Sequence, residues 1–369
     1  MGEPLNLELL QTLSEAFGPS GCEEEVRAIL SAWVKPFCDA METDALGNLL
    51  VYYGKNADSV APSRVKLMLS AHMDEVGIMV TAATDEGLLR VDEVGGIDAR
   101  VLCGKRVRLL APDGMRDGVI LEKPIHLQEK EERETVCEIP ALYLDVGAKT
   151  EKEALALAPV GTFGTFDSRL LFLGDTKIAC KALDDRAGCA ILCEVLQALH
   201  QSGKRPDFPI CFAFTVREEV GLSGAKVAAN RLKPEYAVIL ETTAVADLYG
   251  VPSEKKVAVQ GEGGGLSLAE DRSTVYPEAW VHFLMDTAKA RDIPCQYKRY
   301  VSGGNDAAHI QRSQNGVQVA ALSAPSRYLH SAANVLDHRD LTAMRDLVLA
   351  LIETLPDYDT ANDSKHQED

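Results

Sequence analysis

The sequence has 369 residues, of which 46% are hydrophobic and 25% charged. This is typical of a globular protein long enough for one large domain and a smaller one. Its 38 basic and 56 acidic residues give a net charge of -18, which argues against nucleic acids and anionic membranes as partners because both require positive potential. No apolar run approaches the ~18 residues of a membrane helix, and no signal-peptide pattern opens the chain. The nine cysteines are odd in number and lack a Cys-x-x-Cys pair, which favours reduced thiols in a cytoplasmic protein.

The first part of the chain has the pattern of an α/β domain. Apolar periodicity predicts helices over residues 5–17 and 20–34, the second beginning with a capping box of Ser20 and Glu23. Residues 49–53 and 65–71 are predicted as strands. His72 and Asp74 follow the second strand at its carboxyl end, which is where open α/β sheets place their ligands.

Short apolar runs punctuated by glycine replace this pattern from about residue 77 to residue 175. We expect a small, barrel-like β-rich domain over 77–175, inserted into an α/β domain made of residues 1–76 and 176–357. The charged run 128–134 inside the insert is expected to be a solvated helix or loop. The polar tail over 358–369 is expected to be disordered.

The turn between a predicted strand and helix at residues 177–190 carries two adjacent acids, Asp184 and Asp185. Aspartate is a favoured helix N-cap, and a lone Asp-Asp before a helix is most often a cap. A functional interpretation therefore depends on comparable residues elsewhere. Further helices are predicted over 223–232 and 277–291, and Asp340 is expected to cap a last amphipathic helix.

Comparable residues do follow three later strands. They are Glu218 and Glu219 after strand 210–216, Glu241 at the end of strand 236–240, and His330 in the loop after strand 317–322. A single strand-end histidine is more often structural, and an isolated pair of glutamates usually faces solvent. The inference therefore rests on their occurrence together. Because the strand ends of a mostly parallel sheet share one edge, we expect these groups to converge with His72 and Asp184.

So many carboxylates at one edge would repel one another unless cations neutralised them. Two histidines with carboxylates and no cysteine suit Zn²⁺, Co²⁺ or Mn²⁺ in a hydrolytic site better than an all-oxygen calcium site. The glycine-rich segment 261–265 is not followed by the Lys-Ser/Thr of a phosphate-binding loop, and no Gly-x-Ser-x-Gly motif occurs. A hydrolytic metal site is the function that these residues predict.

Five segments resemble the successive signature motifs of the TET-type (tetrahedral) aminopeptidases, the cocatalytic metallopeptidases that include glutamyl and deblocking aminopeptidases. They are AHMDEVG (71–77), KALDDRAG (181–188), REEVGLSGA (217–225), GGNDAAHI (303–310) and PSRYLHS (325–331). The resemblance extends over nearly the whole chain and includes KPIHLQEKEER (123–133) in the insert. It implies a zinc-exopeptidase-type α/β/α sandwich with a mostly parallel central sheet, and an inserted β-domain used for dimerisation. Dimers of this family commonly assemble into hollow dodecamers.

The same resemblance implies roles for individual residues. Two divalent metal ions per chain are implied, with zinc or cobalt favoured and manganese as an alternative. One ion would be held by His72, Asp184 and Glu241, and the other by Asp184, Glu219 and His330. A second set would act around the ions: Glu218 as general base and acid, Asp74 to orient His72, and Asp185 to support the site from outside.

The function expected from these observations is the removal of amino-terminal residues from peptide substrates. A related amidohydrolase or carboxypeptidase, and a catalytically silent metal-stabilised assembly protein, remain as alternatives. Glu218 argues against the silent protein because a purely structural site needs no unliganded base. Glu241 stands where many relatives have Asp, and Asn305 replaces a frequent Thr; both differences bear on substrate preference rather than on metal binding.

Overall fold

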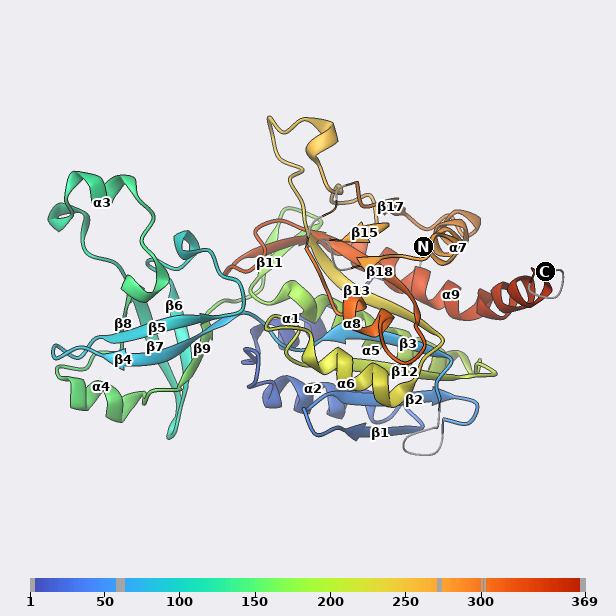
Figure 1. Ribbon diagram of the computed structural model, residues 1–369, viewed down its shortest axis with the longest axis horizontal. Helices are drawn as coiled ribbons and strands as arrows, with labels where there is room; N and C mark the ends of the chain where they lie inside the picture. The colour runs from blue at the N-terminus through green and yellow to red at the C-terminus, as the bar shows by residue number, and fades with distance from the viewer. Residues whose placement is uncertain (1–3, 58–63, 271–273, 300, 302, 366–369) are drawn as a thin grey trace.

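The computed structural model describes residues 4–57, 64–270, 274–299, 301 and 303–365. Figure 1 shows a larger α/β domain beside a smaller body made of strands, which is inserted between two strands of the larger domain. None of the helices in the described ranges combines the length and apolar character needed to cross a bilayer.

The larger domain is built on an eight-stranded sheet in the order β1-β2-β12-β3-β13-β18-β14-β17. Its central strands β12, β3, β13 and β18 run parallel to one another, and β1, β2 and β14 add antiparallel pairings. The strands are β1 (Ala40–Thr43), β2 (Leu49–Gly54), β3 (Leu67–His72), β12 (Pro209–Thr215), β13 (Tyr236–Ala244), β14 (Gly264–Leu266), β17 (Cys295–Tyr297) and β18 (Gln318–Ser326). The central strands are buried along nearly their whole length, which explains their continuous apolar sequences.

Helices cover both faces of this sheet, as expected for an α/β/α sandwich. The buried helix α5 packs on β3 and β13 and is flanked by α1, α2 and α9, while α6 packs on β12 and α8 on β18. The helices of this domain are α1 (Leu7–Glu15), α2 (Glu24–Val34), α5 (Leu183–Ser202), α6 (Ser223–Leu232), α7 (Glu278–Ala290), α8 (Ala307–Gln311) and α9 (His338–Lys365). Two small sheets complete it: β10 (Leu171–Leu173), β11 (Lys177–Cys180) and β19 (Asn334–Asp337), and β15 (Ala269–Glu270) with β16 (Thr274–Val275).

The inserted body is a closed barrel in the order β4-β5-β8-β7-β6-β9, with its own apolar core. Its strands are β4 (Gly77–Ala83), β5 (Leu89–Val94), β6 (Arg106–Ala111), β7 (Gly114–Leu121), β8 (Tyr143–Asp145) and β9 (Phe163–Phe166). The short helices α3 (Lys130–Glu134) and α4 (Glu151–Leu157) lie outside it, and α3 is the exposed charged run. The barrel ends at Phe166, because β10 pairs with β11 of the larger domain.

Three local expectations are wrong. Ser20 and Glu23 form no capping box; the Ser20 hydroxyl donates to the Asp74 carboxylate at 2.6 Å, a charged and therefore stronger acceptor. Asp340 lies inside the first turn of α9 and accepts the amides of Gly261 and Gly263. The strand that precedes Asp184 is not in the main sheet at all, because β11 pairs antiparallel with β10 and β19.

The tail is also more ordered than expected, since α9 continues to Lys365 and only residues 366–369 lie outside the described ranges. Tyr358 packs against Trp280 and Phe283 of α7, with ring centroids 5.2 and 4.6 Å away. Asp359 accepts a hydrogen bond from the Tyr236 hydroxyl at 2.9 Å. The polar composition predicted disorder over 358–369, whereas Tyr358 and Asp359 have tertiary partners.

Candidate active site

The site lies where three parallel strands and the start of one helix approach each other. His72 ends β3, Glu241 lies in β13 three residues before its end, and the segment after β12 carries Glu218 and Glu219. Asp184 reaches the same place from the first turn of α5, which follows β11 of the small antiparallel sheet. The predicted convergence therefore occurs, although the strand before Asp184 belongs to the small sheet and not to the main one.

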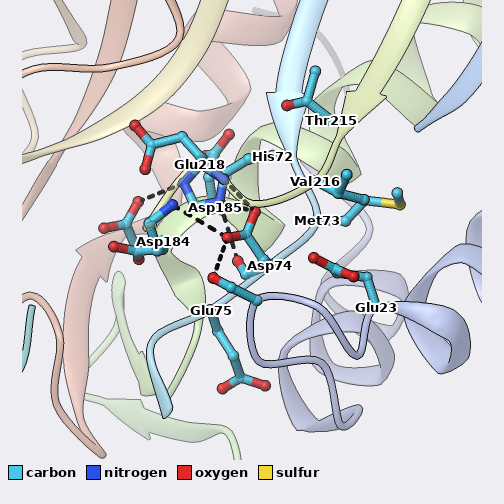
Figure 2. A network of polar contacts seen from close by, with 12 residues as sticks. Glu23, His72, Met73, Asp74, Glu75, Asp184, Asp185, Thr215, Val216 and Glu218 are labelled. Atoms are coloured by element: carbon cyan, nitrogen blue, oxygen red, sulfur yellow. Dashed lines mark hydrogen bonds and ion pairs between the residues drawn. The ribbon is translucent and has the colours of Figure 1, made fainter. Parts of the chain in front are cut away.

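His72, Asp184 and Glu241 form a first, fully buried triad. The His72 Nε2 atom lies 3.4 Å from Asp184 Oδ1 and 3.8 Å from Glu241 Oε1. One ligand atom from each residue can be chosen so that all three lie within 4.8 Å of one another. Figure 2 shows the His72 ring facing Asp184 on one side and Asp74 on the other.

Asp184, Glu219 and His330 form a second triad that shares its central carboxylate with the first. The His330 Nε2 atom lies 3.4 Å from Asp184 Oδ2 and 3.3 Å from Glu219 Oε2, and these ligand atoms also fit within 4.8 Å. The two oxygens of Asp184 thus face different histidines. A carboxylate in this position can bridge two cations.

Each histidine is oriented through its other ring nitrogen. The His72 Nδ1 atom donates to the backbone carbonyl of Asp74 at 3.1 Å, and the His330 Nδ1 atom donates to the backbone carbonyl of Gly96 at 2.6 Å. A carbonyl oxygen only accepts hydrogen bonds, so both contacts place the proton on Nδ1 and leave Nε2 free as a ligand.

Asp74 organises the segment that carries the two glutamates. Its carboxylate accepts the backbone amides of Glu218 at 3.0 Å and Glu219 at 3.2 Å, together with the Ser20 hydroxyl. The Asp74 Oδ1 atom lies 3.5 Å from His72 Nδ1, while the hydrogen bonds that the carboxylate accepts fix the turn after β12. Ser20 was not predicted as a site residue, because its spacing to Glu23 matched a capping box.

A buried ionic cluster lies directly behind the site and was also missed. Lys181 donates to the Glu75 carboxylate at 2.8 Å and to the carbonyl of Ala16 at 2.7 Å. Arg186 donates to three backbone carbonyls, those of Leu13, Met73 and Gly18. Both cations are completely buried. Lys181 and Arg186 lie on either side of Asp184 in the sequence, and this was the one available signal that they support the Asp184 turn.

Electrostatics within the cluster indicate a deficit of positive charge. Burial and the Asp184 carboxylate raise the pKa of Glu219 to about 8, and burial raises the pKa of Glu241 well above its usual value. Burial works against protonation of His330, but Asp184 and Glu219 raise its pKa to about 9. Burial alone would also raise the pKa of Asp184, yet the nearby His330 and His72 rings hold it far below its usual range. The raised pKa values of His330, Glu219 and Glu241 all indicate that added positive charge is favoured in this cluster.

The residues present fit divalent cations. The Asp184 Oδ1 atom is buried without a hydrogen-bond partner, which is costly for a carboxylate unless a cation contacts it. The donors are imidazole nitrogens and carboxylate oxygens, the set preferred by zinc and neighbouring transition metals. Asp185 accepts the amide of Gly188 at 3.0 Å through Oδ1, and its buried Oδ2 atom has no hydrogen-bond partner, but it belongs to neither triad.

Comparison with known proteins identifies the family. The sequence model of the M42 glutamyl aminopeptidases matches residues 47–347. The chain belongs to the M42 family. As an M42 member it is a hydrolase of the aminopeptidase class, and M42 peptidases are metal-dependent.

Individual M42 relatives support this over nearly the full length. The lysyl aminopeptidase of Pyrococcus furiosus is 30% identical over 356 residues, which cover 95% of this chain and 98% of the relative. The TET aminopeptidase of a marine sediment Thaumarchaeota archaeon has a similar structure, with a TM-score of 0.89, 32% identity, and coverage of 94% and 95% of the two chains. The Pyrococcus horikoshii TET1 peptidase, which can assemble into a tetrahedron or a large octahedral shell, gives a TM-score of 0.82 at 33% identity and covers 94% and 98%.

Proposed function

We propose that this M42 protein is a dinuclear metal-dependent aminopeptidase that removes amino-terminal residues from peptides. The observation that carries the proposal is the pair of triads that share Asp184 beside a carboxylate, Glu218, that belongs to neither. Two ligand sets joined by one bridging carboxylate are what a two-metal hydrolase requires.

His72, Asp184 and Glu241 would hold one ion, and Asp184, Glu219 and His330 the other. The donor set favours zinc or cobalt, with manganese as a further candidate. Bound there, the two ions would supply Lewis-acid chemistry, polarising the substrate carbonyl and lowering the pKa of the attacking water.

Glu218 is the group available to move the proton. Burial raises its pKa well above the usual value, His72 opposes this, and Asp306 and Glu219 add to it. A carboxyl group with a raised pKa can accept a proton from the attacking water and deliver it to the leaving amine. Asp74 holds the amide of Glu218 and thereby fixes where this carboxyl group lies.

Assembly into larger particles forms part of the proposal. The barrel and the segment around α3 expose apolar side chains that a partner would cover. They are Leu110, Met115 and Val119 in the barrel strands, and Ile125, Leu127 and Val136 on either side of α3. We expect the insert to form a dimer and the dimers a dodecamer, as the TET relatives suggest, so that only unfolded peptides reach the sites. Light scattering that gives a stable monomer of 40.0 kDa would contradict both levels, and a stable dimer would contradict the dodecamer alone.

A cytoplasmic location also belongs to the proposal. All nine cysteines are free thiols, which supports a reducing compartment.

Activity on small substrates tests the enzymatic proposal directly. The metal-free protein is loaded with Zn²⁺, Co²⁺ or Mn²⁺ and assayed with a panel of amino acid p-nitroanilides, their N-acylated forms and carboxyl-terminal substrates. Turnover that needs both the ions and a free amino terminus is expected. Preferential cleavage of acylated or carboxyl-terminal substrates would instead support the amidohydrolase or carboxypeptidase alternative.

A further inference from the structure

We infer that the inserted barrel positions the second metal site of the larger domain, through its Gly95–Ile97 loop and its exit strand. This inference rests on the proposed dinuclear site and assigns supporting residues to one half of it.

The first contact is the hydrogen bond that orients His330. Its acceptor, the carbonyl of Gly96, belongs to the loop that leaves β5 of the barrel, 234 residues away in the sequence. The bond fixes the tautomer that presents Nε2 to Asp184 and Glu219. An orienting partner of this kind typically affects metal affinity by about 10- to 100-fold.

The second contact is steric and involves the neighbouring glycine. Gly95 has φ +84°, and a Cβ atom there would lie 3.2 Å from the Glu219 Cβ and 2.9 Å from the Val76 Cγ1. The barrel loop therefore packs directly against the backbone side of a second-site ligand. Any side chain at this position would strain the loop and push it away from Glu219.

The third contact is made where the chain leaves the barrel. Ser168, two residues after β9, donates to the carbonyl of Ala332 at 2.7 Å and accepts the amide of Lys181 at 3.3 Å. Ala332 lies two residues beyond His330, and Lys181 three residues before Asp184. One hydroxyl thus ties the exit of the barrel to the two segments that carry second-site ligands.

The first triad is tied to the barrel less directly, through Glu75, three residues after His72, whose carboxylate accepts the Thr165 hydroxyl of β9 at 2.7 Å. The hydrogen bonds and ion pairs recorded for the side chains of His72 and Glu241 all join residues of the larger domain. His330 itself needs external support because of its loop conformation. His330 has φ +56°, and Tyr328, two residues earlier in the same loop, has φ +59°. A loop with two non-glycine residues in this strained conformation keeps its shape only through its contacts. A shift of the barrel should therefore change the second site more than the first.

Two glycines of the insert provide a matched test. Gly95→Ala introduces the contacts described above, whereas Gly147→Ala is the control, because Gly147 has a similar φ of +80° but a Cβ atom there would have nothing within 4 Å. Full-length protein is freed of metal and titrated with Co²⁺ by calorimetry, and bound metal is counted by elemental analysis. Gly95→Ala is expected to lose about 10- to 100-fold in affinity for the second ion while the first changes by less than about twofold. Gly147→Ala should titrate like the wild type.

Circular dichroism and thermal unfolding establish that each variant is folded. If Gly95→Ala does not fold, Ser168→Ala decides, with an expected loss of about tenfold for the second ion and a smaller loss for the first. The inference is overturned if the folded variant binds both ions as Gly147→Ala does, or if both ions weaken equally. A wild-type chain that binds fewer than two Co²⁺ ions would contradict the proposed function itself, and with it this inference.

Discussion

The two triads share Asp184 but are supported in different ways. The His72 side chain is 2% exposed and lies at the end of a central strand, oriented by a carbonyl two residues further on. The His330 side chain is 34% exposed, lies in a strained loop, and is oriented by the barrel. Local, buried support makes the first triad the more rigid of the two, and long-range support makes the second the more sensitive to change.

Removing the shared carboxylate should have the largest effect. Asp184→Asn leaves neither triad with its bridging oxygen, so we expect loss of both ions and a fall in turnover of more than about 10⁴-fold, beyond the usual contribution of acid–base catalysis alone. Metal analysis and p-nitroanilide turnover measure this. Retention of two tight ions by Asp184→Asn would show that the triads do not share this residue.

The next largest effect is expected from the adjacent glutamates, one of which is proposed to act in catalysis and the other in metal binding. Glu218→Gln is expected to keep both ions and lose about 10² to 10⁴ in turnover, because the amide cannot carry the proton. Glu219→Gln serves as the matched variant and should lose the second ion, with activity partly restored by excess metal. Loss of metal from Glu218→Gln, with Glu219→Gln still loaded, would reverse the two roles.

The comparison between triads is tested most directly by their histidines. His330→Ala should lower the affinity for the second ion and leave the first ion bound. The loss should exceed that expected for a supporting residue, which is about 10- to 100-fold. His72→Ala should weaken the first ion instead. Calorimetric titration of both proteins with Co²⁺ measures this, and equal loss of both ions in each variant would mean that the triads act as one unit.

Ser20→Ala should have a smaller effect of about tenfold on metal affinity or activity, the lower end of the range for residues that support ligands. The change removes the hydroxyl donor from Asp74 and leaves its two backbone donors in place. Ser14→Ala is the matched control, because Ser14 is also fully buried but its hydroxyl has no hydrogen-bond partner. Ser20→Ala with wild-type affinity and turnover would show that the backbone amides suffice to hold Asp74.

The smallest expected effect concerns a carboxylate outside the site, where the pKa shift is opposite to that of Glu219. Burial would raise the pKa of Asp337, but Arg339 and Thr176 donate to it and lower its pKa to about 2. A folded-state pKa below the unfolded value stabilises the protein above the usual aspartate pKa of about 3.9, and this stability is lost as pH falls toward 2. Urea unfolding between pH 6 and 3 should therefore show a gap between wild type and Asp337→Asn that closes in acid. A gap independent of pH would contradict this assignment.

Much of the fold follows from the sequence because its signals are local. Helix 223–232 has the predicted bounds, and the buried strands were predicted from continuous apolar runs that are typical of a parallel sheet. The insert was indicated by glycine-punctuated apolar runs, which the structure resolves into a closed barrel. The seven proposed site residues could be named because each follows or ends a recognisable element and because the motifs resemble one family.

Only the tertiary structure decided which partners those residues take. Periodicity describes neighbours along the chain, and nothing in it indicates that Ser20 prefers a carboxylate 54 residues away to its own helix. Nor does it indicate that β11 leaves the main sheet, or that the orienting carbonyl of His330 comes from the barrel. Such choices depend on which acceptors are buried and charged once the domains have packed, because burial sets the strength of each hydrogen bond. The sequence determined the chemistry of the proposed ligands, and packing determined what holds each of them in place.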